Sequence, residues 1–165
     1  MYNADIRTIP HREQRYDTVG DWFADSATMK IYVSSMGIRE YEVLVAVHEL
    51  VEAELCRKMG ITEQMVDAWD LAHEDEDEPG ALPDCPYREA HLRAEAIERV
   101  LANDLGVDWE HYDRTVKAVV KDTPLPSDPT VHGKPPEYQR EKPQKRYRAP
   151  FIKPKQKKRS VLRDR

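Results

Sequence analysis

One stretch of the sequence decides the fold: Arg39-Glu-Tyr-Glu-Val-Leu-Val-Ala-Val-His-Glu-Leu-Val-Glu-Ala-Glu-Leu-Cys-Arg-Lys-Met59. It contains no Gly or Pro, and Gly60 follows it where a helix commonly ends. When the stretch is drawn as a helix, its apolar residues gather on one face: Tyr41, Leu44, Val45, Leu55 and Met59. His48 and Glu52 lie in the middle of that face. We therefore predict a helix over residues 39–59 whose inward face carries a histidine and a carboxylate.

A second helix is expected to begin at Pro86 and to end before Gly106. Its inward face carries His91, Glu95 and Glu98. They share that face with apolar residues: Tyr87, Ala94, Leu101, Ala102 and Leu105. An ionised carboxylate buried without a partner is costly, so these groups must be paired, protonated or bound to a cation. A metal ion would satisfy them together, and a network of histidines hydrogen-bonded to glutamates is the alternative.

The rest of the N-terminal part indicates an α+β fold that is mostly helical. Residues 5–9 and 30–36 have the composition of short strands. Residues 62–72 and 109–120 are predicted to form two further helices. Between them, residues 73–80 form an acidic, turn-rich loop.

The charge of the chain is strongly divided along its length. Residues 134–165 hold 13 Lys and Arg against 3 Asp and Glu, whereas residues 1–133 hold 13 against 28. Eight of the 12 prolines lie at or after Pro124, where they remove backbone donors and block helices. We therefore predict a domain over residues 1–122 and a Pro-rich, basic, disordered tail over residues 123–165.

The basic segment, residues 134–165, suits binding to nucleic acid or to an acidic protein. A solvated tail, or one that folds back on the acidic domain, fits the same composition. The longest uncharged apolar run, residues 43–47, is far too short to span a membrane, so a cytoplasmic protein is expected. The two cysteines, Cys56 and Cys85, exclude both a disulfide framework and a four-cysteine zinc module.

Two quoted segments carry a family resemblance. Ile31-Tyr-Val-Ser-Ser-Met36, followed by His48-Glu-Leu-Val-Glu52, resembles the strand and active-site helix of small zincin metallopeptidases, above all the ImmA-type minimal zincins of mobile elements and phages. In that family a His-Glu-x-x-His helix precedes a helix with a Glu-x-x-Ala ligand pattern. Here Glu52 replaces the second histidine, and His91 of His91-Leu-Arg-Ala replaces the downstream glutamate. The resemblance covers roughly residues 30–105.

The resemblance implies a zincin-like fold and a zinc-dependent peptide hydrolase. Its ligands would be His48, Glu52 and His91, a set of two histidines and one carboxylate that leaves a position open for water. Glu49 would act as the general base. The strand over residues 30–36 would be the edge on which an extended peptide substrate lies. Three acidic residues are candidates to orient a histidine or to add a ligand: Glu95, Glu98 and Asp70.

Two other functions fit parts of the same pattern. Glu49-x-x-Glu52 and Glu95-x-x-Glu98 resemble the acidic pairs of all-helical, magnesium-dependent nucleotide pyrophosphohydrolases. A non-enzymatic phage or host interaction protein would use the domain and the basic tail to bind different partners. A looser likeness to uncharacterised phage-encoded proteins, through Glu78-Pro-Gly and Pro86-Tyr-Arg, indicates a phage origin, and a phage-encoded protein would be located in the host cytoplasm or the virion.

Overall fold

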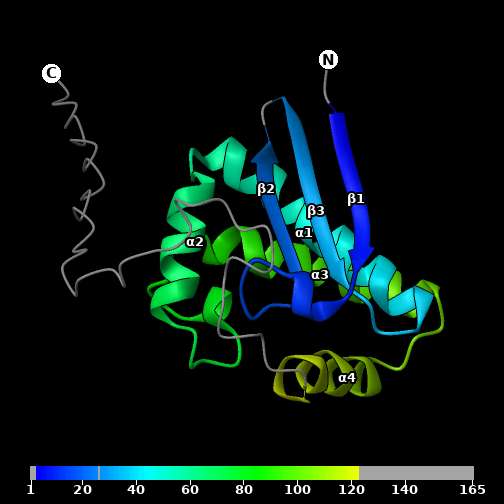
Figure 1. The fold of residues 1–165 in the computed structure, drawn as a ribbon. Helices are drawn as coiled ribbons and strands as arrows, with labels where there is room; N and C mark the ends of the chain where they lie inside the picture. Colours follow the sequence, from blue (N-terminus) through cyan, green and yellow to red (C-terminus); the bar gives the residue numbers. More distant parts are fainter. Residues whose placement is uncertain (1–2, 26, 123–165) are drawn as a thin grey trace, which may run out of the picture.

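A computed structural model describes residues 3–25 and 27–122 (Figure 1). Its elements, in chain order, are β1 (Asn3–Ile9), η1 (His11–Glu13), β2 (Gly20–Asp25), β3 (Thr28–Ser34), α1 (Arg39–Met59), α2 (Glu63–Ala72), η2 (Pro79–Ala81), α3 (Arg88–Asp104) and α4 (Trp109–Asp122). The predicted α+β class is confirmed, as are the four predicted helices. The predicted tail, residues 123–165, lies outside the described residues.

The sheet has the order β1-β3-β2, with β1 parallel and β2 antiparallel to β3. The strand that was expected at the edge, over residues 30–36, is therefore the central one, and that prediction is wrong. The central position of β3 agrees with the burial of its side chains, because Ile31 and Val33 are completely buried. The sequence prediction contained only two strands, so it left no partner for the second side of β3.

β2 was missed because its sequence, Gly20-Asp-Trp-Phe-Ala-Asp25, begins and ends with residues that disfavour strands. Tertiary contacts compensate for this. The buried carboxylate of Asp21 accepts from the Arg15 guanidinium at 2.5 and 2.6 Å. Only two residues separate β2 from β3 in the register, so the two strands form a hairpin.

α1 packs against β2 and β3, and α3 packs along α1, so these two helices lie on one face of the sheet (Figure 1). The core between the sheet and α1 joins Ile31 and Val33 of β3 to Leu44 and Val45 of α1. Gly60 ends α1 in the left-handed conformation, as expected. Two residues expected on the inward faces, Met59 and Leu105, are instead about 40% exposed: 39% and 43%. Both stand at the ends of their helices, beyond the packed interface.

Among the residues that the structure describes, no helix combines the length and the apolar character that crossing a membrane requires.

Candidate metal centre

Three side chains from two helices meet at one point. His48 and Glu52 are one turn apart on α1, and His91 reaches them from α3. His91 Nδ1 lies 3.0 Å from Glu52 Oε2 and 3.2 Å from His48 Nε2, and His48 Nε2 lies 3.5 Å from Glu52 Oε2. This is the trio for which the sequence predicts metal binding, and the packing of α1 on α3 brings it together.

The three ligand atoms form a triangle whose size suits zinc. A tetrahedral zinc ion with bonds of about 2.0–2.1 Å requires ligand atoms about 3.3 Å apart. The observed sides of 3.0, 3.2 and 3.5 Å surround this value. Two imidazoles and one carboxylate are also the donor types that zinc accepts. These residues could therefore hold a metal ion in the described part of the chain.

Glu98 orients His48. Glu98 Oε2 lies 2.8 Å from His48 Nδ1, and because a carboxylate only accepts, the proton resides on Nδ1. The other nitrogen, Nε2, then faces Glu52 and His91. The hydroxyl of Tyr112, on α4, donates to Glu98 Oε1 and fixes that carboxylate. Glu98 thus has the place expected of a residue that orients a ligand.

Without a metal, the cluster shares protons. Burial raises the pKa of Glu52, but hydrogen bonds with His48 and His91 outweigh it and lower that pKa to about 2. Burial lowers the pKa of His48, yet hydrogen bonds with Glu52 and Glu98 raise it well above its ordinary value. The metal-free site is therefore a carboxylate that holds protonated imidazole. A metal ion would take the place of the proton on Nε2.

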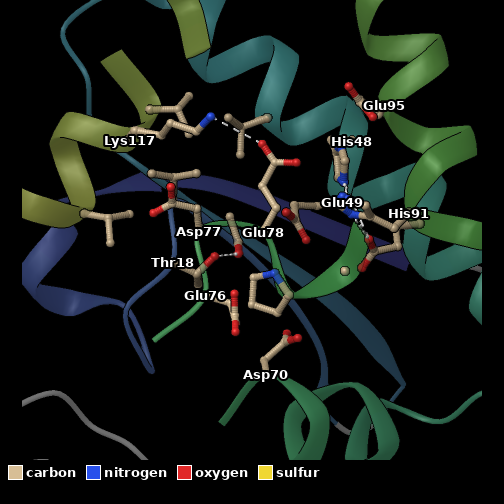
Figure 2. Close-up of a pocket in the computed structure, with 18 of the residues that line it drawn as sticks. Thr18, His48, Glu49, Asp70, Glu76, Asp77, Glu78, His91, Glu95 and Lys117 are labelled. Atoms are coloured by element: carbon tan, nitrogen blue, oxygen red, sulfur yellow. Dashed lines mark hydrogen bonds and ion pairs between the residues drawn. The ribbon is translucent and has the colours of Figure 1, made fainter. Parts of the chain in front are cut away.

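Glu49 follows His48 directly and lies on the wall of the same pocket (Figure 2). Burial, together with repulsion from Glu52, raises its pKa well above the usual value. Its carboxylate approaches the backbone of β2 closely. A Cβ at Gly20 would lie 2.6 Å from Val45 Cγ1 and closer still to Glu49 Oε1, so a larger residue there would force both side chains to shift.

His91 is positioned by a second glycine. A Cβ at Gly80 would lie 2.7 Å from His91 Cγ and 2.8 Å from its Nδ1. The Tyr87 ring also packs edge-on against the imidazole, with 6.4 Å between the ring centroids. The loop before α3 therefore fixes the ring plane of His91.

The other two acidic candidates do not reach the histidines. Glu95 pairs with Arg99 on the same helix, at 2.6 Å, although it lines the pocket. Asp70 instead accepts hydrogen bonds from the hydroxyls of Tyr87 and Tyr16. Its link to the centre is indirect and passes through Tyr87, the residue that packs against His91.

Asp70 makes the fold sensitive to pH. Burial raises the pKa of Asp70 from 3.8 to about 7, despite the Tyr87 hydrogen bond that lowers it. The folded state therefore binds this proton more tightly than the unfolded chain does. As a result, the free energy of unfolding falls as the pH rises from 3.8 to about 7. We expect Asp70→Asn to remove this fall and to stabilise the metal-free chain above neutral pH, by at most about 4 kcal/mol.

Urea unfolding of the metal-free chain at several pH values measures this effect. Asp84→Asn, a change at an exposed loop position, is the control. If Asp70→Asn keeps the pH dependence of the original chain, the ionisation of Asp70 does not govern stability.

The centre opens into a pocket of about 810 Å³ whose lining is strongly acidic. Glu76, Asp77 and Glu78 stand on the wall opposite His48 (Figure 2). Lys117 of α4 holds this loop through Glu78, at 3.5 Å. A pocket lined mainly by one sign of charge attracts groups of the opposite sign.

Sequence reasoning missed several residues that shape the centre. Trp22 donates its indole N–H to Glu52 Oε1 at 3.1 Å, yet as a tryptophan in the core it gave no sign of this role. Tyr112 comes from another helix, 14 residues after Glu98. A glycine in a strand, as at Gly20 at the start of β2, can mark a close backbone approach and is the one available signal.

Comparison with protein-family models, with curated proteins and with solved structures finds no match for this chain.

Proposed function

We propose that the chain is a zinc-dependent peptide hydrolase whose ligands are His48, Glu52 and His91. The observation that carries the proposal is the triangle of three ligand atoms at the spacing of a zinc tetrahedron. Three protein ligands leave a fourth position, which is typical of catalytic rather than structural zinc. The zincin-like resemblance of the sequence around His48 supports the same reaction class.

Each neighbouring residue then has a chemical task. Bound zinc supplies Lewis acidity, which activates water and polarises a peptide carbonyl. Glu49 accepts the proton of the attacking water and passes it to the leaving amine. Burial and the nearby Glu52 raise the pKa of Glu49, which makes its carboxylate, once ionised, a stronger proton acceptor than an ordinary glutamate. Glu98, held by Tyr112, keeps His48 oriented throughout.

The substrate is expected to enter through the pocket rather than along a strand edge. β2 is the edge strand nearest the centre, but three of its outer backbone groups are already engaged: Ala24 N–H donates to Glu63, and the carbonyls of Trp22 and Gly20 accept from Arg15 and Thr18. The acidic lining favours Lys and Arg side chains. Residues 134–165 of this chain are rich in Lys and Arg, so a peptide of this segment serves as a first test substrate.

The decisive experiment is the metal content of the purified full-length chain, by elemental mass spectrometry. We expect about one zinc per chain, with loss in each single variant His48→Ala, Glu52→Ala and His91→Ala. Glu95→Ala is the matched control, since Glu95 lies on α3 one turn from His91 but pairs with Arg99. A well-folded chain without metal would instead make the cluster a hydrogen-bonded network.

The magnesium-dependent nucleotide hydrolase remains the second enzymatic candidate. Two observations favour zinc over it. The two acidic pairs do not converge, because Glu95 is turned to Arg99, and the fold contains a sheet rather than helices alone. Magnesium or manganese that stays bound after both histidines are replaced would favour the nucleotide reaction. The third candidate function is that of a non-enzymatic interaction protein. No contact among the described residues specifically favours that function, but a chain that binds no metal would favour it.

A further inference from the structure

The two carboxylate oxygens of Glu52 have different partners. Oε2 faces both imidazoles, at 3.0 Å from His91 Nδ1 and 3.5 Å from His48 Nε2. Oε1 accepts a hydrogen bond from Trp22 Nε1 at 3.1 Å. Glu52 is only 7% exposed, so water has little access to compete for either oxygen.

We propose that Trp22 is a positioning residue that selects zinc, because its indole N–H holds Oε1 and leaves Glu52 a single oxygen for the metal. This inference rests on the proposed zinc site. With Oε1 held, the cluster presents three donor atoms, which suits four-coordinate zinc. Calcium and magnesium require six or more ligands, mostly oxygens, and manganese shares their preference. A freely rotating Glu52 could bind through both oxygens and serve such ions better.

The indole is held in place independently of Glu52. Trp22 lies on β2, opposite Ile31 of the central strand. Its ring packs against both apolar clusters of the domain, one around Ile31 and Leu44, the other around Cys56 and Val66. The ring therefore cannot follow the carboxylate if Glu52 turns. This rigidity makes the hydrogen bond a restraint on Glu52 rather than an adaptable contact.

The test compares Trp22→Phe with the unmodified full-length chain. We expect the variant to bind zinc about 10- to 100-fold more weakly, the usual cost of losing an outer partner of a metal ligand. Its affinity for manganese should not fall, so the preference for zinc decreases. Bound cobalt(II) should lose the intense visible absorption of a tetrahedral site as Oε1 joins the coordination.

Trp69→Phe is the matched control, because Trp69 donates its indole N–H to the carbonyl of Pro79 rather than to one of the three proposed ligands. If Trp22→Phe folds poorly, Trp22 is replaced by β-benzothienylalanine, which keeps the shape of the ring but has no N–H. The same three measurements then apply to this variant.

The possible results separate the inference from the function on which it rests. An unmodified chain that binds no zinc would overturn both. Zinc bound normally by the unmodified chain, with unchanged zinc affinity and cobalt spectrum after loss of the N–H, would overturn only the role of Trp22. An equal fall in zinc and manganese affinity, with an unchanged spectrum, would also overturn it, since a merely structural residue acts in that way.

Discussion

Glu49→Gln is expected to slow peptide hydrolysis by about a hundred- to ten-thousand-fold, the usual contribution of a general base, while zinc stays bound. The substitution keeps the size of the side chain, so the tight contact of Glu49 with Gly20 is preserved. It removes only the ability to accept a proton. Zinc content should be unaffected, because Glu49 is not among the three residues whose ligand atoms converge.

The rate is measured on the full-length chain with a peptide of residues 134–165 and with an acidic peptide of equal length. Glu95→Gln is the control, since it makes the same chemical change in the lining of the same pocket. Glu49→Gln with normal activity would remove the proposed mechanism. Loss of zinc in that variant would make Glu49 a ligand rather than a base.

The helices and the centre of the site could be predicted because they depend on local patterns. The i, i+4 spacing of His48 and Glu52 on an apolar face is visible in the sequence alone, as is the corresponding placement of His91 and Glu98. Buried charges need partners, so two such faces in one small domain had to meet. The structure shows that they meet across α1 and α3.

The remaining features depend on contacts between distant segments. β2 contains a buried aspartate that is stable only beside Arg15, and no propensity scale reports such a pair. The partner of Glu52 is Trp22, 30 residues earlier in the chain. Asp70 was one candidate partner for a histidine, but the hydroxyls of Tyr87 and Tyr16 take both of its oxygens. These contacts are set by tertiary packing, which local sequence patterns do not report.

The strand-edge expectation was wrong for a related reason. With only two predicted strands, the one before α1 had to lie at an edge. The third strand, β2, takes that place, and Arg15, Thr18 and Glu63 engage its outer side. The same residues that stabilise a short strand of poor propensity therefore also close the path along which an extended peptide was expected to bind.

Removal of zinc is expected to destabilise the folded full-length chain by about 4 kcal/mol, when compared with zinc present at a thousand times its dissociation constant. Zinc stabilises the chain because the three ligands are assembled only in the folded state, where zinc replaces a proton between buried groups. Urea unfolding with zinc, and again with a chelator, measures the difference.

His91→Ala is the control for that comparison, because without its third ligand the stability should not depend on zinc. The gain should also shrink as the pH falls through the raised pKa of His48, since zinc must displace the His48 proton that Glu52 helps to hold. A hydrogen-bonded network has the opposite response. Zinc would add nothing at any pH, and the pairing of protonated His48 with Glu52 would keep its contribution to stability until the pH falls below about 4.5, the ordinary pKa of Glu52, and would lose it progressively toward the lowered pKa of about 2.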